Sequence, residues 1–286
     1  MFAIDIHGLG KTFQGKKQQA VEALKGLNLS IEQGEVLGFL GPNGAGKSTT
    51  IKCLMGLISP TIGSATIMGR DIASSDARKT VGYLPENPAF YDYLTAEEYL
   101  LFVGRAFQMS PALLAQRTDE MLRLLELWDA RKRLIRSYSK GMVQRVGLAQ
   151  VLIHDPDVYL LDEPMSGLDP IGRALVKDII LGLKMRGKCV FFSTHITDDV
   201  EKVCDRVAVI NKGQLLTVDT VDNILQRGTE GYTVTLISTD GSKELFVDKA
   251  DLQAFIQQTV NNQQKIEKIE PRRKDMEAFF LEIVAQ

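Results

Sequence analysis

The chain has 286 residues, a formal net charge of −2 and 44% hydrophobic residues. This length suffices for one large domain and one small domain, and the near-neutral charge indicates neither a nucleic-acid nor a membrane-surface partner. No apolar run approaches the roughly 18 residues that a membrane-spanning helix needs, and the first residues show no secretion signal. Three widely spaced cysteines favour small buried side chains over a metal site or a disulfide. We therefore expect a cytosolic chain, or one held at a membrane only by its partners.

Residues 1–218 predict one α/β domain. Two short strands before Leu29 are expected to form an antiparallel hairpin, the start of an N-terminal β subdomain. Apolar strands then alternate with helices, and this pattern is typical of a mostly parallel central sheet with right-handed crossovers. The predicted strands of that sheet include 36–40, 81–86, 158–161, 189–193 and 206–211.

A helical subdomain, at about residues 88–154, interrupts the alternation. Thr95 to Glu98 forms a capping-box sequence that opens one helix, and Ser110-Pro111 starts a second helix with proline at its first position. In the second helix a core-facing stripe is predicted at Leu114, Met121, Leu124, Leu125 and Trp128.

A change of pattern near residue 219 predicts a small C-terminal α+β domain, residues 219–286. Residues 232–237 and 244–247 read as two strands joined by a turn at Asp240-Gly241. Amphipathic helices are expected at 250–260 and 274–284. The segment contains no catalytic constellation of its own.

A complete phosphate-binding loop follows the first predicted strand of the parallel sheet and precedes a helical pattern. It has the form of a glycine, four residues and then Gly-Lys-Ser. Its glycines let backbone N–H groups point at phosphate oxygens, and the helix N-terminus adds a favourable dipole. We expect Lys47 to reach the β- and γ-phosphates and the Ser48 hydroxyl to ligate Mg²⁺. The residues predicted to hold a nucleoside triphosphate are Gly41, Pro42, Asn43, Gly44, Ala45, Gly46, Lys47, Ser48 and Thr49.

Further catalytic candidates lie at the carboxyl ends of two predicted strands, where ligands bind in open α/β sheets. Asp162 is placed to hold the Mg²⁺ shell. Glu163, one residue further, projects towards an attacking water that it can polarise or deprotonate. His195 ends the strand 189–193, and its position favours contact with the γ-phosphate. A pair of solvated acids and a structural histidine are the alternatives.

In their order along the chain, these motifs resemble those of the ATP-binding subunit of an ABC transporter, over roughly residues 2–218. Phe13 stands where the family has an aromatic residue that stacks on adenine, and His195 stands at the switch histidine. Residues 139–145 are similar to the signature motif, which contacts the γ-phosphate of ATP held by the opposite subunit, and residues 166–169 are similar to the D-loop. The resemblance thus implies nucleotide contacts for Ser139, Gly141, Gln144 and Asp169.

Two departures from the family pattern concern charge near the nucleotide. The signature motif has Lys140 and Met142 where glycine and glutamine are usual. Glu86 stands at the Q-loop position of a glutamine. A carboxylate at this position can still bind a metal-linked water, so Glu86 joins Ser48 and Asp162 as a predicted metal-site residue. ATPases of the ABC-2 export branch have similar departures. This chain also resembles them in residues 82–86 and in its short C-terminal extension.

The resemblance implies an ATPase that uses ATP and Mg²⁺ and powers transport, with export favoured, through a separate integral membrane permease. Glu163 would activate water, while Lys47 and His195 would stabilise charge on the γ-phosphate. The chain would dimerise head to tail with a second copy of itself or a related ATPase subunit, without nucleic acid. The permease would dock on residues 88–154 next to Glu86 and hold the chain at the cytoplasmic face of the cell membrane.

Two other functions stay open from the sequence. A soluble ABC-type ATPase acting on ribosomes or DNA is the first, although such proteins usually carry two ATPase units or long inserted arms. A GTPase or small-molecule kinase is the second. Residues 211–214 superficially resemble a guanine-reading motif, but the aspartate that would pair with guanine is absent.

Overall fold

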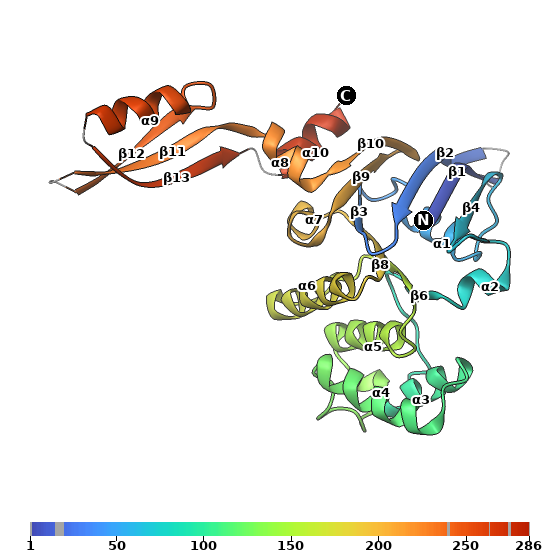
Figure 1. Ribbon diagram of the computed structural model, residues 1–286. Helices are drawn as coiled ribbons and strands as arrows, with labels where there is room; N and C mark the ends of the chain where they lie inside the picture. The colour runs from blue at the N-terminus through green and yellow to red at the C-terminus, as the bar shows by residue number, and fades with distance from the viewer. Residues whose placement is uncertain (1, 15–19, 239–240, 263, 274–275, 286) are drawn as a thin grey trace. The chain divides into compact units, whose positions relative to one another are not determined.

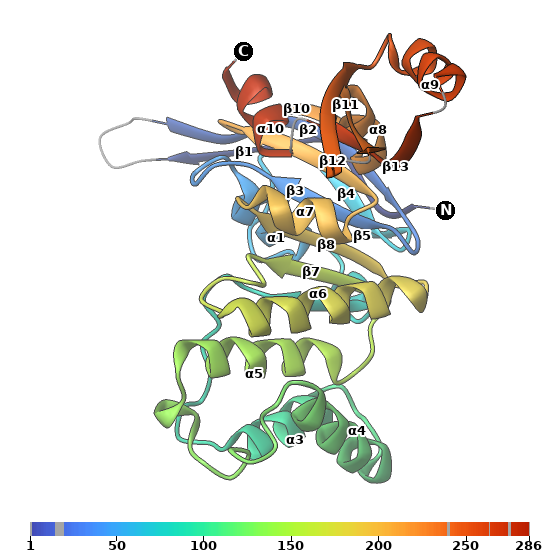
Figure 2. The ribbon, with the colours of Figure 1, turned by 90° about the vertical axis from the view of Figure 1, so that its left-hand side faces the viewer.

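The computed structural model describes residues 2–14, 20–238, 241–262, 264–273 and 276–285. The chain divides into two compact units, Met1–Val218 and Asp219–Gln286, whose elements are labelled in Figures 1 and 2. Asp240 of the predicted turn and Lys274 of the last predicted helix lie outside the described residues. None of the described helices is both long and apolar enough to cross a bilayer.

The first unit is built around a six-stranded sheet with the order β10-β9-β3-β8-β7-β6. Within this sheet, parallel pairing joins β9 to β3, β3 to β8, β8 to β7 and β7 to β6. This confirms the predicted mostly parallel central sheet. The strands are β3 (Val36–Leu40), β6 (Val81–Leu84), β7 (Val158–Asp162), β8 (Cys189–Thr194), β9 (Arg206–Asn211) and β10 (Gln214–Thr220).

A separate antiparallel sheet with the order β2-β1-β4-β5 forms the predicted N-terminal β subdomain. Antiparallel pairing joins β1 to both β2 and β4. The elements of this part are β1 (Phe2–Gln14), β2 (Ala20–Glu32), α1 (Lys47–Leu54), β4 (Ile62–Ile67), β5 (Arg70–Asp71) and α2 (Ser75–Arg78).

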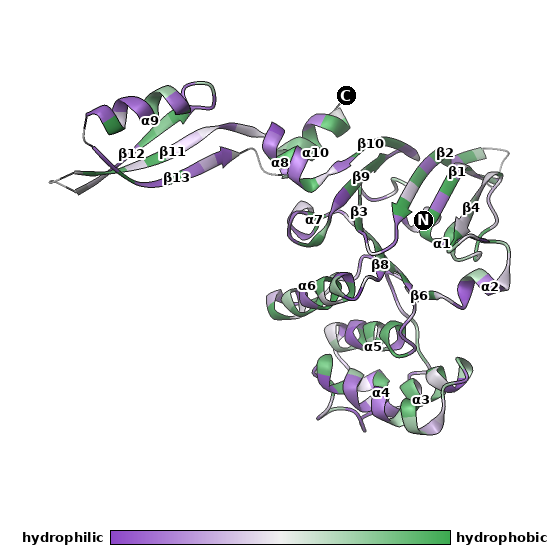
Figure 3. Ribbon diagram, in the orientation of Figure 1, coloured by the Kyte–Doolittle hydropathy of each residue, from purple (hydrophilic) through white to green (hydrophobic). Residues whose placement is uncertain are grey.

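The central strands are buried on both faces, because alternate residues enter two different hydrophobic clusters. Val158 and Leu160 of β7 pack with α1 and the N-terminal sheet, whereas Tyr159 and Leu161 pack with the helices. Figure 3 shows hydrophobic and hydrophilic residues alternating along α6 (Pro170–Met185), as expected for a helix that lays one face on the core.

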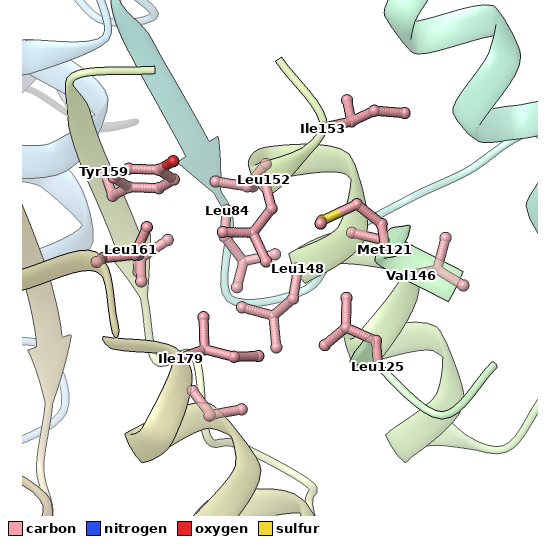
Figure 4. Packing of buried hydrophobic residues seen from close by; sticks show 14 of the residues in the cluster. Leu84, Met121, Leu125, Val146, Leu148, Leu152, Ile153, Tyr159, Leu161 and Ile179 are labelled. Carbon is pink, nitrogen blue, oxygen red and sulfur yellow. The ribbon is translucent and has the colours of Figure 1, made fainter. Parts of the chain in front are cut away.

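The helical subdomain forms one body with the sheet through shared side-chain packing. In Figures 1 and 2, α5 (Lys140–Leu152) lies between α6 and the pair formed by α3 (Ala96–Ala106) and α4 (Pro111–Leu124). Figure 4 shows Leu148 and Leu152 of α5 among Leu84 of β6, Leu161 of β7 and Met121 of α4. The remaining elements of the unit are the short 3-10 helix η1 (Ile135–Ser137) and α7 (Thr197–Val203).

The predicted capping box is present in full, but one predicted core position of the second helix is wrong. Thr95 accepts the N–H of Glu98, and the Glu98 side chain accepts the N–H of Thr95. On α4, Leu124 is exposed and Leu122 is buried in its place. Leu122 lies eight residues after Leu114 and one after Met121, so it belongs to the same helix face, which the broad stripe misjudged.

The second unit is a three-stranded antiparallel sheet with the order β12-β11-β13, covered on one face by α9. Val234, Leu236 and Val247 form its small buried core, against Leu252 and Phe255 of the helix. The strand β13 was not predicted, since its sequence is mostly charged and contains Pro271. The elements are α8 (Val221–Arg227), β11 (Thr229–Ser238), β12 (Gly241–Asp248), α9 (Leu252–Asn261), β13 (Lys265–Arg273) and α10 (Met276–Ala285).

Candidate nucleotide-binding site

The parallel sheet brings the carboxyl ends of four strands to one edge. Leu40 of β3 pairs with Thr194 of β8, and Ser193 pairs with Asp162 of β7. Leu84 of β6 is in register with Leu161. Four segments far apart in sequence therefore meet here: the phosphate-binding loop, the pair Asp162-Glu163, His195 and the residues that lead to Glu86.

The phosphate-binding loop has backbone conformations that only glycine adopts easily. Gly44 and Gly46 have φ angles of 79° and 112°, both in the region that disfavours a Cβ atom. A Cβ at Gly46 would also lie 2.8 Å from the carbonyl oxygen of Ala23. Gly46 is the N-cap of α1 and has no side chain to bond the first turn, so the N–H groups of that turn are left for an anion.

A cavity of about 360 Å³ opens over this loop. Glu86 and Glu163 line it from the other strand ends, and Ala23 of β2 closes one side. The P-loop residues that line the cavity are Pro42, Asn43, Gly44, Ala45, Gly46, Lys47, Ser48 and Thr49. Gly41 lies just behind it, where a Cβ would be 2.4 Å from the carbonyl oxygen of Ile210.

The Lys47 ammonium group is buried and makes three polar contacts. Its Nζ donates to the carbonyl oxygens of Gly41 at 2.7 Å and Pro42 at 3.3 Å. It also lies 3.4 Å from Oε1 of Glu163. These contacts hold the positive charge at the floor of the cavity, where a phosphate group of a bound ligand would meet it.

The Glu163 carboxylate lies between Lys47 and His195. His195 Nδ1 is 3.0 Å from both carboxylate oxygens, and half of the histidine side chain is exposed. Because an ionised carboxylate can only accept hydrogen bonds, the hydrogen of a neutral His195 sits on Nδ1 and Nε2 faces outwards as an acceptor. Glu163 has a φ angle of 49°, a conformation that costs a non-glycine residue roughly 1–2 kcal/mol. Such strain is typical of functional sites.

Ser193 orients both acids and was not among the predicted site residues. Its hydroxyl donates to Oδ1 of Asp162 at 2.5 Å and accepts the N–H of Glu163 at 3.1 Å. The serine is fully buried at the end of an apolar strand. The only feature of the sequence that could have pointed to Ser193 as a site residue is its hydroxyl at a strand end, two residues before His195.

The donor set at this edge suits a hard divalent cation. Asp162 is nearly buried, and the bond from Ser193 leaves its second carboxylate oxygen for a further ligand. Ser48 and Glu86 line the cavity, whereas Asp162 lies outside its lining, one residue before the lining residue Glu163. Oxygen ligands of this kind, completed by phosphate and water, are those that Mg²⁺ prefers. The residues present therefore fit the predicted metal ion.

Phe13 lies outside the cavity lining. It pairs with Val21 across the two strands, two residues before the cavity residue Ala23, which lies at a register shift between the strands. The Phe13 ring is exposed, with Lys11 Nζ 5.2 Å from its centroid. Its stacking on adenine stays a prediction.

The predicted signature and D-loop residues form a second exposed surface. Ser139 caps α5 by accepting the N–H of Met142, and Asp169 caps α6 by accepting the N–H of Gly172. A Cβ at Gly141 would lie 3.7 Å from the carbonyl oxygen of Gly167, so the two motifs are neighbours. Ser139 and Asp169 are exposed, and Gly141 is half-buried.

Gln144 has a different setting from the rest of the signature motif. It is only 4% exposed, and its Nε2 donates to the carbonyl oxygen of Pro164 at 3.0 Å and to that of Glu163 at 3.5 Å. The side chain is thus directed at the turn that carries Glu163 in the same chain. These bonds link α5 to the catalytic turn, and the nucleotide contact of Gln144 stays a prediction.

Comparison with known proteins agrees with this geometry. A family model described as ABC transporter matches residues 24–166. An uncharacterized ABC transporter ATP-binding protein of Synechocystis is 49% identical over 76% of this chain and 62% of its own length. The bacitracin transport ATP-binding protein of Bacillus licheniformis is 39% identical over 70% of this chain and 66% of its own length. The chain thus matches less than two thirds of the Synechocystis relative.

Among solved structures, a dimeric ATP-binding cassette in a post-hydrolysis state with ADP and phosphate has a TM-score of 0.71 and 25% identity. The matched region covers 76% of this chain and 98% of the cassette. The fold of the first unit is therefore that of an ABC-type P-loop ATPase, as the sequence predicted.

Proposed function

Since the chain belongs to the ABC transporter family of ATP-binding proteins, we propose that it is the subunit that binds and hydrolyses ATP to power transport through a separate permease. The observation that carries the proposal is the Glu163 carboxylate, held between Lys47 and His195 at the mouth of a P-loop cavity. A base, a cation and a histidine meet where a γ-phosphate would lie. This combination serves phosphoryl transfer to water.

In this proposal each site residue has one task. The N–H groups of residues 43–49 and the Lys47 ammonium bind the triphosphate, and Glu163 accepts a proton from the attacking water. His195 Nε2 points away from Glu163 and is free to contact the γ-phosphate. Ser48, Asp162 and Glu86 would hold Mg²⁺, which neutralises charge on the phosphates when bound.

A head-to-tail dimer is proposed to complete the site. Ser139 and Gly141 lie at the N-terminus of α5, and Asp169 lies in the adjoining turn. Backbone N–H groups and hydroxyls at a helix N-terminus bind anions well. The dimeric cassette similar to this chain supports pairing of two such units. The partner is proposed to be a second copy or a related ATPase subunit.

The permease is proposed to dock in a groove of about 420 Å³ beside the helical subdomain. The groove lies between Met55, Val81 and Tyr83 on the sheet side and Phe107 and Val151 on the helical side. Burial, with Asp162 as a smaller cause, raises the pKa of Tyr83 to about 12, so the phenol stays neutral. Tyr83 is three residues before Glu86, so an occupant of the groove would be close to the nucleotide site.

Docking in the groove would hold the chain at the cytoplasmic face of the membrane. Phe107→Glu replaces an apolar side chain of the groove, whose lining also contains Arg78 and Lys79, with a charged one. It is expected to abolish co-purification with a membrane subunit while leaving ATP binding unchanged. Co-purification of the wild-type chain with ribosomes or DNA, and not with a membrane protein, would favour the soluble alternative. Export is the proposed direction, on the basis of the resemblance of the sequence to the ABC-2 export branch.

We also propose that the boundary between the two units, after residue 218, separates the ATPase domain from an accessory domain. A chain truncated after Val218 is expected to bind ATP with unchanged affinity. Loss of binding on truncation would show that the ATPase domain needs the second unit.

Replacing Glu163 with glutamine tests the catalytic assignment. We expect turnover to fall by about 10²–10⁴-fold, the range that a general base supplies, while Mg-ATP still binds and the dimer accumulates. Glu201→Gln, an exposed residue of α7 outside the cavity, is the control and should keep full activity. Undiminished hydrolysis by the Glu163 variant would remove this residue from the catalytic role.

A further inference from the structure

A buried ion network joins α6 to α7. Asp199 is only 1% exposed, and Nη2 of Arg173 donates to its two carboxylate oxygens at 2.8 and 2.9 Å. Nζ of Lys177 lies 3.0 Å from the same carboxylate. Arg173 and Lys177 are one helical turn apart on α6, so both cations reach one point on the neighbouring helix.

Both helices in this network begin beside predicted catalytic segments. α6 starts at Pro170, directly after the D-loop residues 166–169. α7 starts at Thr197, two residues after His195, and Asp199 is in its first turn. The network therefore connects the D-loop, which adjoins the proposed dimer surface, with the residue predicted to contact the γ-phosphate.

The contacts form a closed circuit through the chain. The N–H of Ser166 bonds to the carbonyl oxygen of Glu163 at 3.0 Å, which ties the D-loop to the catalytic turn. Arg173 of α6 then holds Asp199 of α7, and His195 beside α7 bonds back to Glu163. These contacts form a route by which a movement of the D-loop could reach His195.

We propose that Asp199 is a positioning residue that couples the D-loop to His195, so that contact with the partner subunit at the D-loop sets the histidine for hydrolysis. This inference rests on the proposed ATPase site. Ile171, at the start of α6, is 69% exposed and offers the partner an apolar contact next to the network.

The burial of these charges holds α6 and α7 at a constant distance. A buried carboxylate without its cations would be strongly disfavoured, so α6 and α7 keep their spacing while Asp199 is ionised. Burial disfavours the charged form of Lys177, but its bonds to Asp198 and Asp199 outweigh this effect and raise its pKa. Asp198 itself is 54% exposed and contacts Lys177 and Lys202 at 2.8 Å. An exposed pair of this kind contributes little stability.

The test compares Asp199→Asn with Asp198→Asn in the full chain. ATP hydrolysis is measured under single-turnover conditions and at steady state, in the wild-type background and in a His195→Ala background. In the wild-type background Asp199→Asn is expected to lower kcat about tenfold or more with KM for ATP nearly unchanged, since nucleotide binding is not its task. Asp198→Asn should keep kcat within about twofold because the Asp198 carboxylate is itself half exposed and Asp199 keeps its contacts with Arg173 and Lys177.

The His195→Ala background separates coupling from a merely structural role. If Asp199 acts through His195, Asp199→Asn causes no further loss of kcat there. An equal loss of kcat in both backgrounds would overturn the proposal, because the network would then only hold α6 and α7 together. If Asp199→Asn does not fold, Arg173→Gln tests the same contact, because Lys177 still neutralises Asp199. Full turnover by Glu163→Gln would instead overturn the catalytic site itself, so the two failures are distinguishable.

Discussion

Oε1 of Glu163 lies 3.4 Å from Nζ of Lys47, and both side chains are almost fully buried. The ammonium group donates hydrogen bonds to the carbonyl oxygens of Gly41 and Pro42, and the Glu163 carboxylate is its ion-pair partner. A bound phosphate would compete with this carboxylate for the ammonium charge. The negative charge of Glu163 also opposes the triphosphate.

Glu163→Gln is therefore expected to tighten nucleotide binding. The change removes both the ion pair that occupies Lys47 and the charge that repels phosphate. We expect the Kd for a non-hydrolysable ATP analogue to fall about tenfold, equivalent to about 1.4 kcal/mol. Isothermal titration calorimetry on the purified chain measures this directly.

Glu86→Gln is the matched control for this effect. It removes a carboxylate from the same cavity, but Glu86 is exposed, so its charge is better screened by solvent. A smaller gain in affinity is expected. Equal Kd values for wild type and the Glu163 variant would mean that the ion pair does not compete with ATP.

Ser193→Ala is expected to damage both stability and activity. The buried hydroxyl bonds to Asp162 and to the N–H of Glu163. Its removal leaves the buried Oδ1 of Asp162 without this donor, at a cost of about 1–3 kcal/mol in the free energy of unfolding, whereas the N–H of Glu163 keeps its bond to the carbonyl oxygen of Ser193 at 3.2 Å. Because Asp162 loses its orientation, we also expect the Mg²⁺ concentration for half-maximal turnover to rise.

Ser30→Ala provides a control of the same chemistry outside the site. The Ser30 hydroxyl donates to Oδ1 of Asp5 at 2.6 Å, and neither residue lines the cavity. This variant should lose some stability and keep its Mg²⁺ dependence. A Mg²⁺ dependence of Ser193→Ala that matches wild type would show that Asp162 does not need the serine.

His154 is expected to make the fold sensitive to mild acid. Its ring stacks on Phe107 with centroids 3.7 Å apart, and burial lowers its pKa from 6.5, more than the Val81 backbone and the Asp155 charge raise it. The unfolded chain then binds more protons than the folded chain as pH falls below 6.5. Stability is therefore lost progressively below that pH.

His154→Phe keeps an aromatic ring and removes the titration. The Tm difference between wild type and variant is measured from pH 8 to pH 5. We expect the difference to be constant above pH 7 and to shift in favour of the variant below pH 6.5. A difference that stays constant over the whole range would mean that His154 titrates alike in both states.

Thr95 and Ser110 offer a paired test of helix capping. Thr95 takes part in a full capping box, whereas Ser110 is an N-cap whose side chain makes no capping bond. Thr95→Ala is expected to lower the free energy of unfolding by about 1 kcal/mol, and Ser110→Ala by less. Chemical denaturation at pH 7 measures both. Equal losses would contradict the assigned capping geometry.

Features that depend on local sequence were predicted well. The P-loop, the strand that ends in Asp162 and the capping box each follow from residues within a few positions of one another. The alternation of strands and helices also predicted the mostly parallel sheet. By contrast β13 was missed, because an edge strand with many charges and a proline lacks the apolar pattern of a buried strand.

The sequence by itself determined which chemical groups the protein carries and where most of its strands and helices lie, because turn glycines, caps and hydrophobic periodicity act over a few residues. Only the tertiary structure decided which groups meet. Ser193 reaches Asp162 across 31 residues, Gln144 reaches Pro164 across 20, and Arg173 reaches Asp199 across 26. Each of these contacts depends on strand register or helix packing, and the pairing of polar groups follows from burying them side by side.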